Sequence, residues 1–139
     1  MSFWKNIFPF SLSKTKKKKE YPNIILNVDP NSLWETTGEL GDGSFGKVYK
    51  AKNRETGAEA AAKIVDIRDE TELDDFMVEI DILAECQHKN VINLYEAYYF
   101  DSKLWMLIEF CPGGALDDII LDLERGLDEA MIKVVCKQM

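Results

Sequence analysis

A glycine-rich segment, Gly41-Asp-Gly-Ser-Phe-Gly46, constrains the fold of this chain more than any other feature. A G-x-G-x-x-G spacing fits a dinucleotide-binding turn when the last glycine opens a helix. Here the next residues, Lys47-Val-Tyr-Lys-Ala51, favour a strand, and a strand-like segment also precedes the glycines. The spacing therefore predicts the tip of a β-hairpin, where backbone N–H groups can approach a phosphate closely. An ordinary glycine-rich hairpin stays open as the alternative.

The order of the predicted elements indicates an α+β fold. A helix interrupts a five-stranded antiparallel sheet, which differs from the alternating order of a βαβ protein. The expected strands cover residues 34–40, 47–51, 59–66, 91–100 and 104–110. The expected helices cover residues 69–86, 115–123 and 127–139.

Lys63 is the first candidate functional residue outside the glycine segment. It lies in Ala60-Ala-Ala-Lys-Ile-Val65, an apolar strand, although lysine is among the residues least often fully buried. On such a strand the ammonium needs an anionic partner, either a ligand or a carboxylate. An edge-strand lysine that reaches solvent is the alternative.

Glu79 is the carboxylate best placed to be that partner. On a helical wheel the apolar residues of the helix at 69–86 occupy one arc, and Glu79 lies just outside its edge. Most other acidic residues of this helix lie away from the arc. An ion pair at ~4 Å attracts by about 4 kcal/mol at an effective dielectric of ~20, before the costs of desolvation and ordering. A boundary glutamate in water is the alternative. The arc is formed by Leu73, Phe76, Met77, Ile80 and Leu83.

Together these features follow the order found in protein kinases, with Lys63 seventeen residues past Gly46 and Glu79 sixteen residues past Lys63. Leu40 to Val48 resembles the kinase glycine-rich loop, and Ala60-Ala-Ala-Lys63 resembles the lysine-bearing third strand. Met77 to Leu83 resembles the C-helix, and Leu107 to Ala115 resembles a gatekeeper, hinge and following turn. Over residues 34–139 the chain resembles the sterile-20-like serine/threonine kinases of the germinal-centre branch.

The resemblance implies a protein-kinase-like N-lobe over residues 34–108, with a five-stranded antiparallel sheet and a C-helix. A hinge over 109–114 and the first helices of a truncated C-lobe over 115–139 would follow. It also implies that Lys63 and Glu79 are catalytic residues, the lysine binding the α- and β-phosphates of ATP and pairing with the glutamate.

Further residues are implied to contact ATP. Leu40, Val48 and Ala61 would sandwich the adenine, with Ile108 behind it as gatekeeper. The backbone of Glu109 and Cys111 would bond the adenine edge, and Asp117 would lie near the ribose. The glycine-rich loop would cover the phosphates through Gly41, Asp42, Gly43, Ser44, Phe45, Gly46 and Lys47.

Three kinase segments do not occur in the 139 residues: His-Arg-Asp, Asp-Phe-Gly and Ala-Pro-Glu. In the family these segments supply the catalytic base, the Mg²⁺ ligands and the lobe on the substrate side. We therefore expect ATP as the ligand, Mg²⁺ ligands downstream of this chain, and protein substrates for the intact kinase only. The chain as given is expected to be inactive, and a truncated, non-catalytic interaction module is the alternative function. A Rossmann-type nucleotide protein is disfavoured by the strand after Gly46.

Charge divides the chain into two parts. Residues 1–20 hold six lysines against one glutamate, whereas the remainder holds eleven Lys and Arg against twenty-four Asp and Glu. The acidic part argues against a nucleic-acid partner, because a binding face would itself be basic. Residues 1–33 are expected to form a basic, largely disordered tail, either solvated or in weak contact with a membrane surface or partner.

Cysteine and histidine content bounds the remaining chemistry. The three cysteines are scattered and odd in number, and the chain has one histidine, so we expect no disulfide framework and no metal site. Free thiols without a secretory leader favour a cytoplasmic setting.

Overall fold

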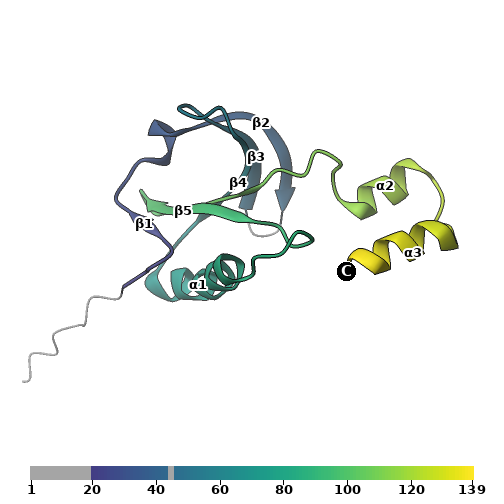
Figure 1. Cartoon of the computed structure of the whole chain (residues 1–139). Helices are drawn as coiled ribbons and strands as arrows, with labels where there is room; N and C mark the ends of the chain where they lie inside the picture. The colour runs from purple at the N-terminus through teal and green to yellow at the C-terminus, as the bar shows by residue number, and fades with distance from the viewer. Residues whose placement is uncertain (1–19, 44–45) are drawn as a thin grey trace, which may run out of the picture.

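The computed structural model describes residues 20–43 and 46–139, and the fold follows the expected order of strands and helices (Figure 1). The expected α+β architecture is confirmed, with one strand added at the N-terminal side. The elements are β1 (Ile25–Leu26), the 3-10 helix η1 (Pro30–Ser32), β2 (Trp34–Gly43), β3 (Gly46–Asn53), β4 (Glu59–Asp66), α1 (Glu70–Glu85), β5 (Leu94–Phe100), β6 (Lys103–Glu109), α2 (Leu116–Asp122) and α3 (Glu129–Gln138).

Six strands form one sheet in the order β1-β5-β6-β4-β3-β2. The five expected strands pair antiparallel with one another, and β1 pairs parallel with β5. Residues 1–33 were expected to form a basic, largely disordered tail, and the described residues 24–32 of that range are ordered instead. Within the described residues of that range, Ile24 and Pro30 are buried, and β1 extends the sheet. It does so because the backbone of the short apolar segment Ile24 to Leu26 pairs with the free edge of β5. Residues 1–19 lie outside the described residues.

The pleat of the sheet sorts side chains onto two faces. The face toward α1 carries an inner cluster, whose buried members are Ile24, Val65, Ile67, Leu73, Ile80, Ala97, Leu104 and Met106. The opposite face carries an outer cluster, whose buried members are Trp34, Ala51, Ala60, Ala62, Tyr98, Trp105 and Leu107. Because residues of β4 alternate between the faces, Lys63 lies on the inner side while its neighbours Ala62 and Ile64 face outward.

A carboxylate joins the outer cluster at the start of β2. Glu96 Oε2 accepts a hydrogen bond of 2.7 Å from the Trp34 indole and one of 2.6 Å from the Tyr98 hydroxyl. Burial, together with the hydrogen bond to the nearby Glu96 carboxylate and its negative charge, raises the pKa of Tyr98 to about 12. The neutral tyrosine is therefore part of the folded state.

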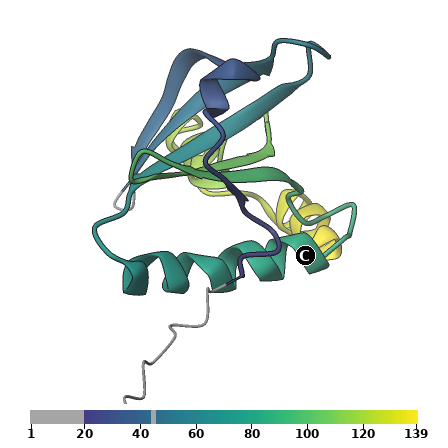
Figure 2. The ribbon, with the colours of Figure 1, turned by 90° about the vertical axis from the view of Figure 1, so that its left-hand side faces the viewer.

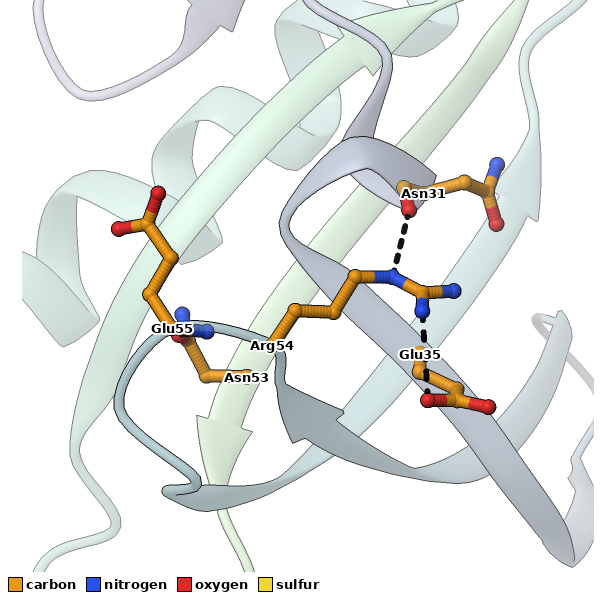
Figure 3. Close-up of polar contacts among 5 residues, drawn as sticks. All are labelled: Asn31, Glu35, Asn53, Arg54 and Glu55. Carbon is orange, nitrogen blue, oxygen red and sulfur yellow. Dashed lines mark hydrogen bonds and ion pairs between the residues drawn. The ribbon is translucent and has the colours of Figure 1, made fainter.

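The turn between β3 and β4 is tied to the segment that precedes β2. The Asn53 side chain accepts from the backbone N–H groups of Glu55 and Thr56, which shapes the turn. Arg54 lies between two groups, donating from Nε to the carbonyl of Asn31 at 3.2 Å and contacting Glu35 at 3.4 Å (Figure 3). Its backbone N–H also donates to Leu33. These bonds hold η1 over the β3–β4 corner of the sheet.

Helix α1 begins at a well-formed N-cap. The Asp69 carboxylate accepts from the N–H groups of Thr71 and Glu72, and Glu72 in turn accepts from the N–H of Arg68. Leu73 and Ile80 are buried in the inner cluster, and the other apolar residues of the predicted arc pack against it. The predicted amphipathic helix is confirmed.

Helices α2 and α3 lie to one side of the sheet and α1 (Figure 1), and neither contains a buried residue. Asn90, in the loop before β5, donates a 2.6 Å hydrogen bond to the carbonyl of Gln138 at the end of α3. In the part of the chain that the structure describes, no helix is both long and apolar enough to cross a bilayer.

Candidate functional site

Lys63 and Glu79 meet between β4 and α1, as the helical wheel predicts. Lys63 Nζ lies 3.1 Å from Glu79 Oε1 and 3.5 Å from Oε2. The Phe76 ring lies beside the same ammonium, with its centroid 5.8 Å from Nζ. The lysine side chain is 22% exposed and the glutamate 44%, so the pair lies at the wall of an open site rather than in the core. Its stabilising effect is correspondingly modest, and its main consequence is orientation.

A hollow of about 560 Å³ adjoins this ion pair, between α1 and the inner face of the sheet. The sheet supplies Lys63 together with Met106 and Ile108 of β6, and the helix supplies Glu79 on the opposite wall. The remaining lining is apolar apart from Asp75 and consists of Val78, Ile82, Leu83 and Ile92. The hollow therefore combines one ammonium, Lys63, and two carboxylates, Asp75 and Glu79, with a largely apolar lining.

The glycine segment forms the end of the β2–β3 hairpin, as its spacing predicts. Gly43 pairs with Gly46 and Gly41 pairs with Val48, with register shifts in β2 just before these pairs. Gly46 has φ 135°, and a Cβ atom there would lie 2.4 Å from the carbonyl oxygen of Ile64, so this position excludes any other residue without local rearrangement. Ser44 and Phe45, predicted to cover the ligand, lie outside the described residues.

The residues expected to surround an adenine ring lie on neighbouring strands of the inner face. Val48 pairs with Lys63, which pairs with Met106. Two residues farther along the same strands, on the same face, Ala61 pairs with Ile108. Ala61 is buried, whereas Leu40 in β2 is exposed. Asp42 is paired in register with Lys47, whose ammonium lies 4.0 Å from the Glu39 carboxylate.

The predicted hinge begins at a residue with several hydrogen bonds. Glu109 donates its backbone N–H to the carbonyl of Asn93 at 2.8 Å. Its carboxylate accepts from Asn93 twice, from the backbone N–H at 3.2 Å and from the side-chain amide at 3.0 Å. Cys111 is exposed, and its thiol lies 4.0 Å from the carbonyl oxygen of Glu109. Asp117 lies in the first turn of α2. It is not among the described residues that line the hollow beside Lys63.

Two residues that the sequence did not single out support this region. Asn93 fixes Glu109, as described above. Lys50 in β3 is paired in register with Ala61 in β4, and its ammonium lies 2.8 Å from the Glu59 carboxylate and 4.7 Å from the centroid of the Phe110 ring. Side chains alternate along a strand, so the position of Lys50 two residues after Val48 could have indicated that both face the same side of the sheet. Nothing in the sequence near Asn93 indicates that its partner is Glu109.

Metal ligation is not organised among the described residues. No group of three or more His, Cys, Asp or Glu side chains in residues 20–43 and 46–139 is arranged to hold an ion. Among the described residues the site offers the Lys63 ammonium, the Glu79 and Asp75 carboxylates, backbone N–H groups of a glycine hairpin and apolar walls. The basic N-terminal tail was expected to contact a membrane surface or a partner. Its lysines lie within residues 1–19, outside the described residues.

Comparisons with known proteins give consistent findings. The family model of the protein kinase domain matches residues 34–139. Serine/threonine-protein kinase 10 of Mus musculus and that of Homo sapiens are each 55% identical over 136 residues, which is 98% of this chain and 14% of the relative. Serine/threonine-protein kinase dst1 of Dictyostelium discoideum is 32% identical over 130 residues, covering 94% of this chain and 17% of the relative. The chain thus spans about a seventh of the length of these two mammalian relatives.

Proposed function

This chain belongs to the protein kinase family, and on that premise we propose that it forms the ATP-binding lobe of a serine/threonine protein kinase. The observation that carries the proposal is the 3.1 Å contact between Lys63 and Glu79 beside the glycine hairpin. The family generally uses ATP and Mg²⁺. Protein serine and threonine hydroxyls are the proposed acceptors in the intact protein.

The proposed role of Lys63 follows from its surroundings. Glu79 holds the ammonium at one point on the wall of the hollow, so the lysine is already oriented when an anionic ligand arrives. An ammonium fixed in this way can neutralise charge on the α- and β-phosphates of ATP, which is the electrostatic contribution that phosphoryl transfer requires. Glu79 does not touch the nucleotide in this scheme and acts as a positioning residue.

The proposed adenine site lies farther along the same strands. Ala61 and Val48 provide a flat, apolar wall, because a small and a β-branched side chain leave room for a planar ring. The backbone of residues 109 to 111 supplies the polar edge, and the three hydrogen bonds between Asn93 and Glu109 keep its first residue in place. Mg²⁺ would supply further charge neutralisation when bound, and its proposed ligands lie outside this chain.

Binding of ATP to the 139-residue chain tests the proposal. Lys63→Met should weaken binding about 10- to 100-fold, the loss expected when a contact between charged groups disappears. Lys103→Met is the matched control, since Lys103 is also paired with an acid, Asp66, but does not line the hollow. Isothermal titration calorimetry should show the parental affinity for that control.

The same experiment distinguishes the alternative function. Equal ATP affinity of the parent and Lys63→Met would remove the proposed role of Lys63 and favour the non-catalytic interaction module. A phosphate-transfer assay with radiolabelled ATP completes the test. We expect no transfer from the 139-residue chain, and Lys63-dependent transfer from a protein that also carries a catalytic loop.

A further inference from the structure

We propose that the segment of residues 21–32, which we call the N-terminal strap, is a positioning element that holds α1, and with it Glu79, against Lys63. The strap runs from α1 along β5, with which its strand β1 pairs in parallel, to η1 (Figure 2). Its use in ATP binding rests on the proposed function, whereas its effect on the ion pair rests on contacts within the structure alone. Three sets of contacts fix the strap along its length.

The first set joins the strap to α1. Ile24 is 6% exposed and belongs to the inner cluster, which also contains Leu73 and Ile80 of the helix. Asn23 donates a 2.8 Å hydrogen bond from its side-chain amide to the Asp81 carboxylate. Tyr21 packs against the same cluster and accepts the backbone N–H of Ile24, so the chain turns where it meets the helix. The strap therefore contacts the helix through both an apolar side chain and a polar bond.

The second set joins the strap to the sheet. In β1, Ile25 is in parallel register with Tyr98 and Leu26 with Tyr99, and Asn27 donates its N–H to the carbonyl of Tyr99. The side chains of Ile25 and Leu26 are exposed, at 40% and 37%. This part of the strap is thus held by backbone hydrogen bonds rather than by side-chain burial.

The third set fixes the far end of the strap to the β3–β4 corner. Pro30 is buried, and Asp29 caps η1 by accepting the N–H of Asn31. The carbonyl of Asn31 accepts the Arg54 guanidinium, which also contacts Glu35 (Figure 3). With this end fixed to the sheet, a shift of α1 away from β5 has to break contacts at the other end of the strap.

Those contacts lie next to the ion pair along the helix. Ile80 and Asp81, the strap's partners in α1, directly follow Glu79, so a rigid helix transmits the strap's hold to the carboxylate. Elsewhere α1 is loosely covered: Val78 and Ile82 are exposed at 61% and 55%, and β5 is the strand with the most extensive packing against α1. The Lys63–Glu79 pair is part-exposed and weak by itself, so its occupancy depends on what else holds the helix.

The experiment compares two isoleucine truncations in adjacent positions of the 139-residue chain. Ile24→Ala removes a buried side chain that contacts the α1 cluster, and Ile25→Ala removes an exposed one from the same segment. Acylation of lysines, quantified by mass spectrometry, reports how freely Lys63 leaves Glu79. Lys103, which pairs with Asp66 away from α1, is the internal reference. Hydrogen exchange over residues 70–85 gives a second readout.

We expect Ile24→Ala to raise the acylation rate of Lys63 relative to Lys103 by about 2- to 30-fold, with faster exchange in α1, and Ile24→Val to restore both. Ile25→Ala should match the parent. If circular dichroism shows that Ile24→Ala is unfolded, Asn23→Ala tests the proposal with the same two measurements, Lys63 acylation and hydrogen exchange in α1. This substitution removes one exposed hydrogen bond without opening a cavity. Unchanged Lys63 acylation in the folded strap variant overturns the proposal, even if the variant is less stable.

A final arm separates this inference from the proposed function. ATP is added to the parent chain during acylation, and protection of Lys63 relative to Lys103 supports nucleotide binding at that lysine. Absence of protection together with faster Lys63 acylation in Ile24→Ala would contradict the proposed function and leave the strap supported. Protection by ATP together with unchanged acylation in Ile24→Ala would do the reverse.

Discussion

The lobe formed by residues 20–110 and the helical part formed by residues 115–139 are built from similar apolar residues but bury them very differently. Every buried apolar residue of the described chain lies in the lobe, between Ile24 and Leu107. In α2 and α3 no residue is buried, and large side chains such as Leu121 and Val134 are 72% and 58% exposed. The difference shows that the local sequence pattern is enough to specify a helix. A functional site such as the Lys63–Glu79 pair also needs packing that fixes the helix relative to the sheet.

Capping illustrates the same point. Both α1 and α3 begin at an aspartate whose carboxylate accepts backbone N–H groups, Asp69 in one and Asp128 in the other. The caps make the two helix starts alike, but only α1 then buries an apolar stripe against strands. Most of a protein helix's stability comes from such packing. Only α1 can therefore present a carboxylate, Glu79, at a fixed distance from another element.

The largest expected effect comes from one truncation made in each region. Ile80→Ala in α1 removes a side chain that is fully buried, and we expect a loss of about 2–5 kcal/mol in the free energy of unfolding. Ile132→Ala in α3 removes one that is 46% exposed, and we expect a change within about 0.5 kcal/mol. Urea denaturation followed by tryptophan fluorescence measures both. Similar losses at the two positions would show that α3 is packed as firmly as α1.

A smaller effect is expected from a pH-sensitive group of the lobe. Because burial raises the pKa of Tyr98 to about 12 while the unfolded chain keeps the ordinary value near 10, neutral Tyr98 stabilises the folded state fully below pH 10. That contribution is lost as pH rises from about 10 to 12. Tyr98→Phe should flatten this part of the stability profile and lower stability at neutral pH by about 1.5–3 kcal/mol through the lost bond to Glu96.

Residues 115–139 contain no tyrosine, so this titration reports on the lobe alone. Denaturation at a series of pH values measures the profile, and Tyr95→Phe is the matched control on the same strand, where the ring is 48% exposed. The parental decline between pH 10 and 12 should persist in that control. A decline as steep in Tyr98→Phe as in the parent would contradict the assignment, since only the part in excess of the loss from ion-paired lysines such as Lys103 is ascribed to Tyr98.

The smallest expected effect concerns the two caps. Asp69→Ala should cost about 1 kcal/mol in global unfolding, because α1 is part of the cooperative lobe. Asp128→Ala should remove a similar amount locally, lowering the helix content of α3 without moving the unfolding midpoint of the lobe. Circular dichroism at 222 nm and tryptophan fluorescence, recorded on the same samples, separate the two. A shifted fluorescence midpoint in Asp128→Ala would show that the regions unfold together.

The sheet and the Lys63–Glu79 ion pair could be predicted from the sequence because each depends on residues close together in the chain. The strand after Gly46 follows from its β-branched and aromatic residues, and the direction of Glu79 follows from the helical period. The same reasoning placed Lys63 on an apolar strand in need of an anion, and the structure provides Glu79 at 3.1 Å. The residues that build this contact carry their pattern within a few positions of themselves.

The parts that were missed depend on pairings between distant segments. The apolar run Ile24-Ile-Leu26 was the available indication of a strand, but its partner β5 becomes an open edge only once the sheet is assembled. The three hydrogen bonds of Asn93 with Glu109 likewise require β5 and β6 to be adjacent. No periodicity within either segment encodes that adjacency.

The parallel pairing of β1 with β5 also bears on the order in which the lobe can assemble. β1 is the first strand of the described chain, yet its partner follows β2, β3, β4 and α1. Closing so large a loop has to wait for short-range hairpins and the helix, because distant contacts are gained only after their entropy cost. We therefore expect the pairing of β1 with β5 to form after the hairpins, so that α1 is folded before the strap holds it.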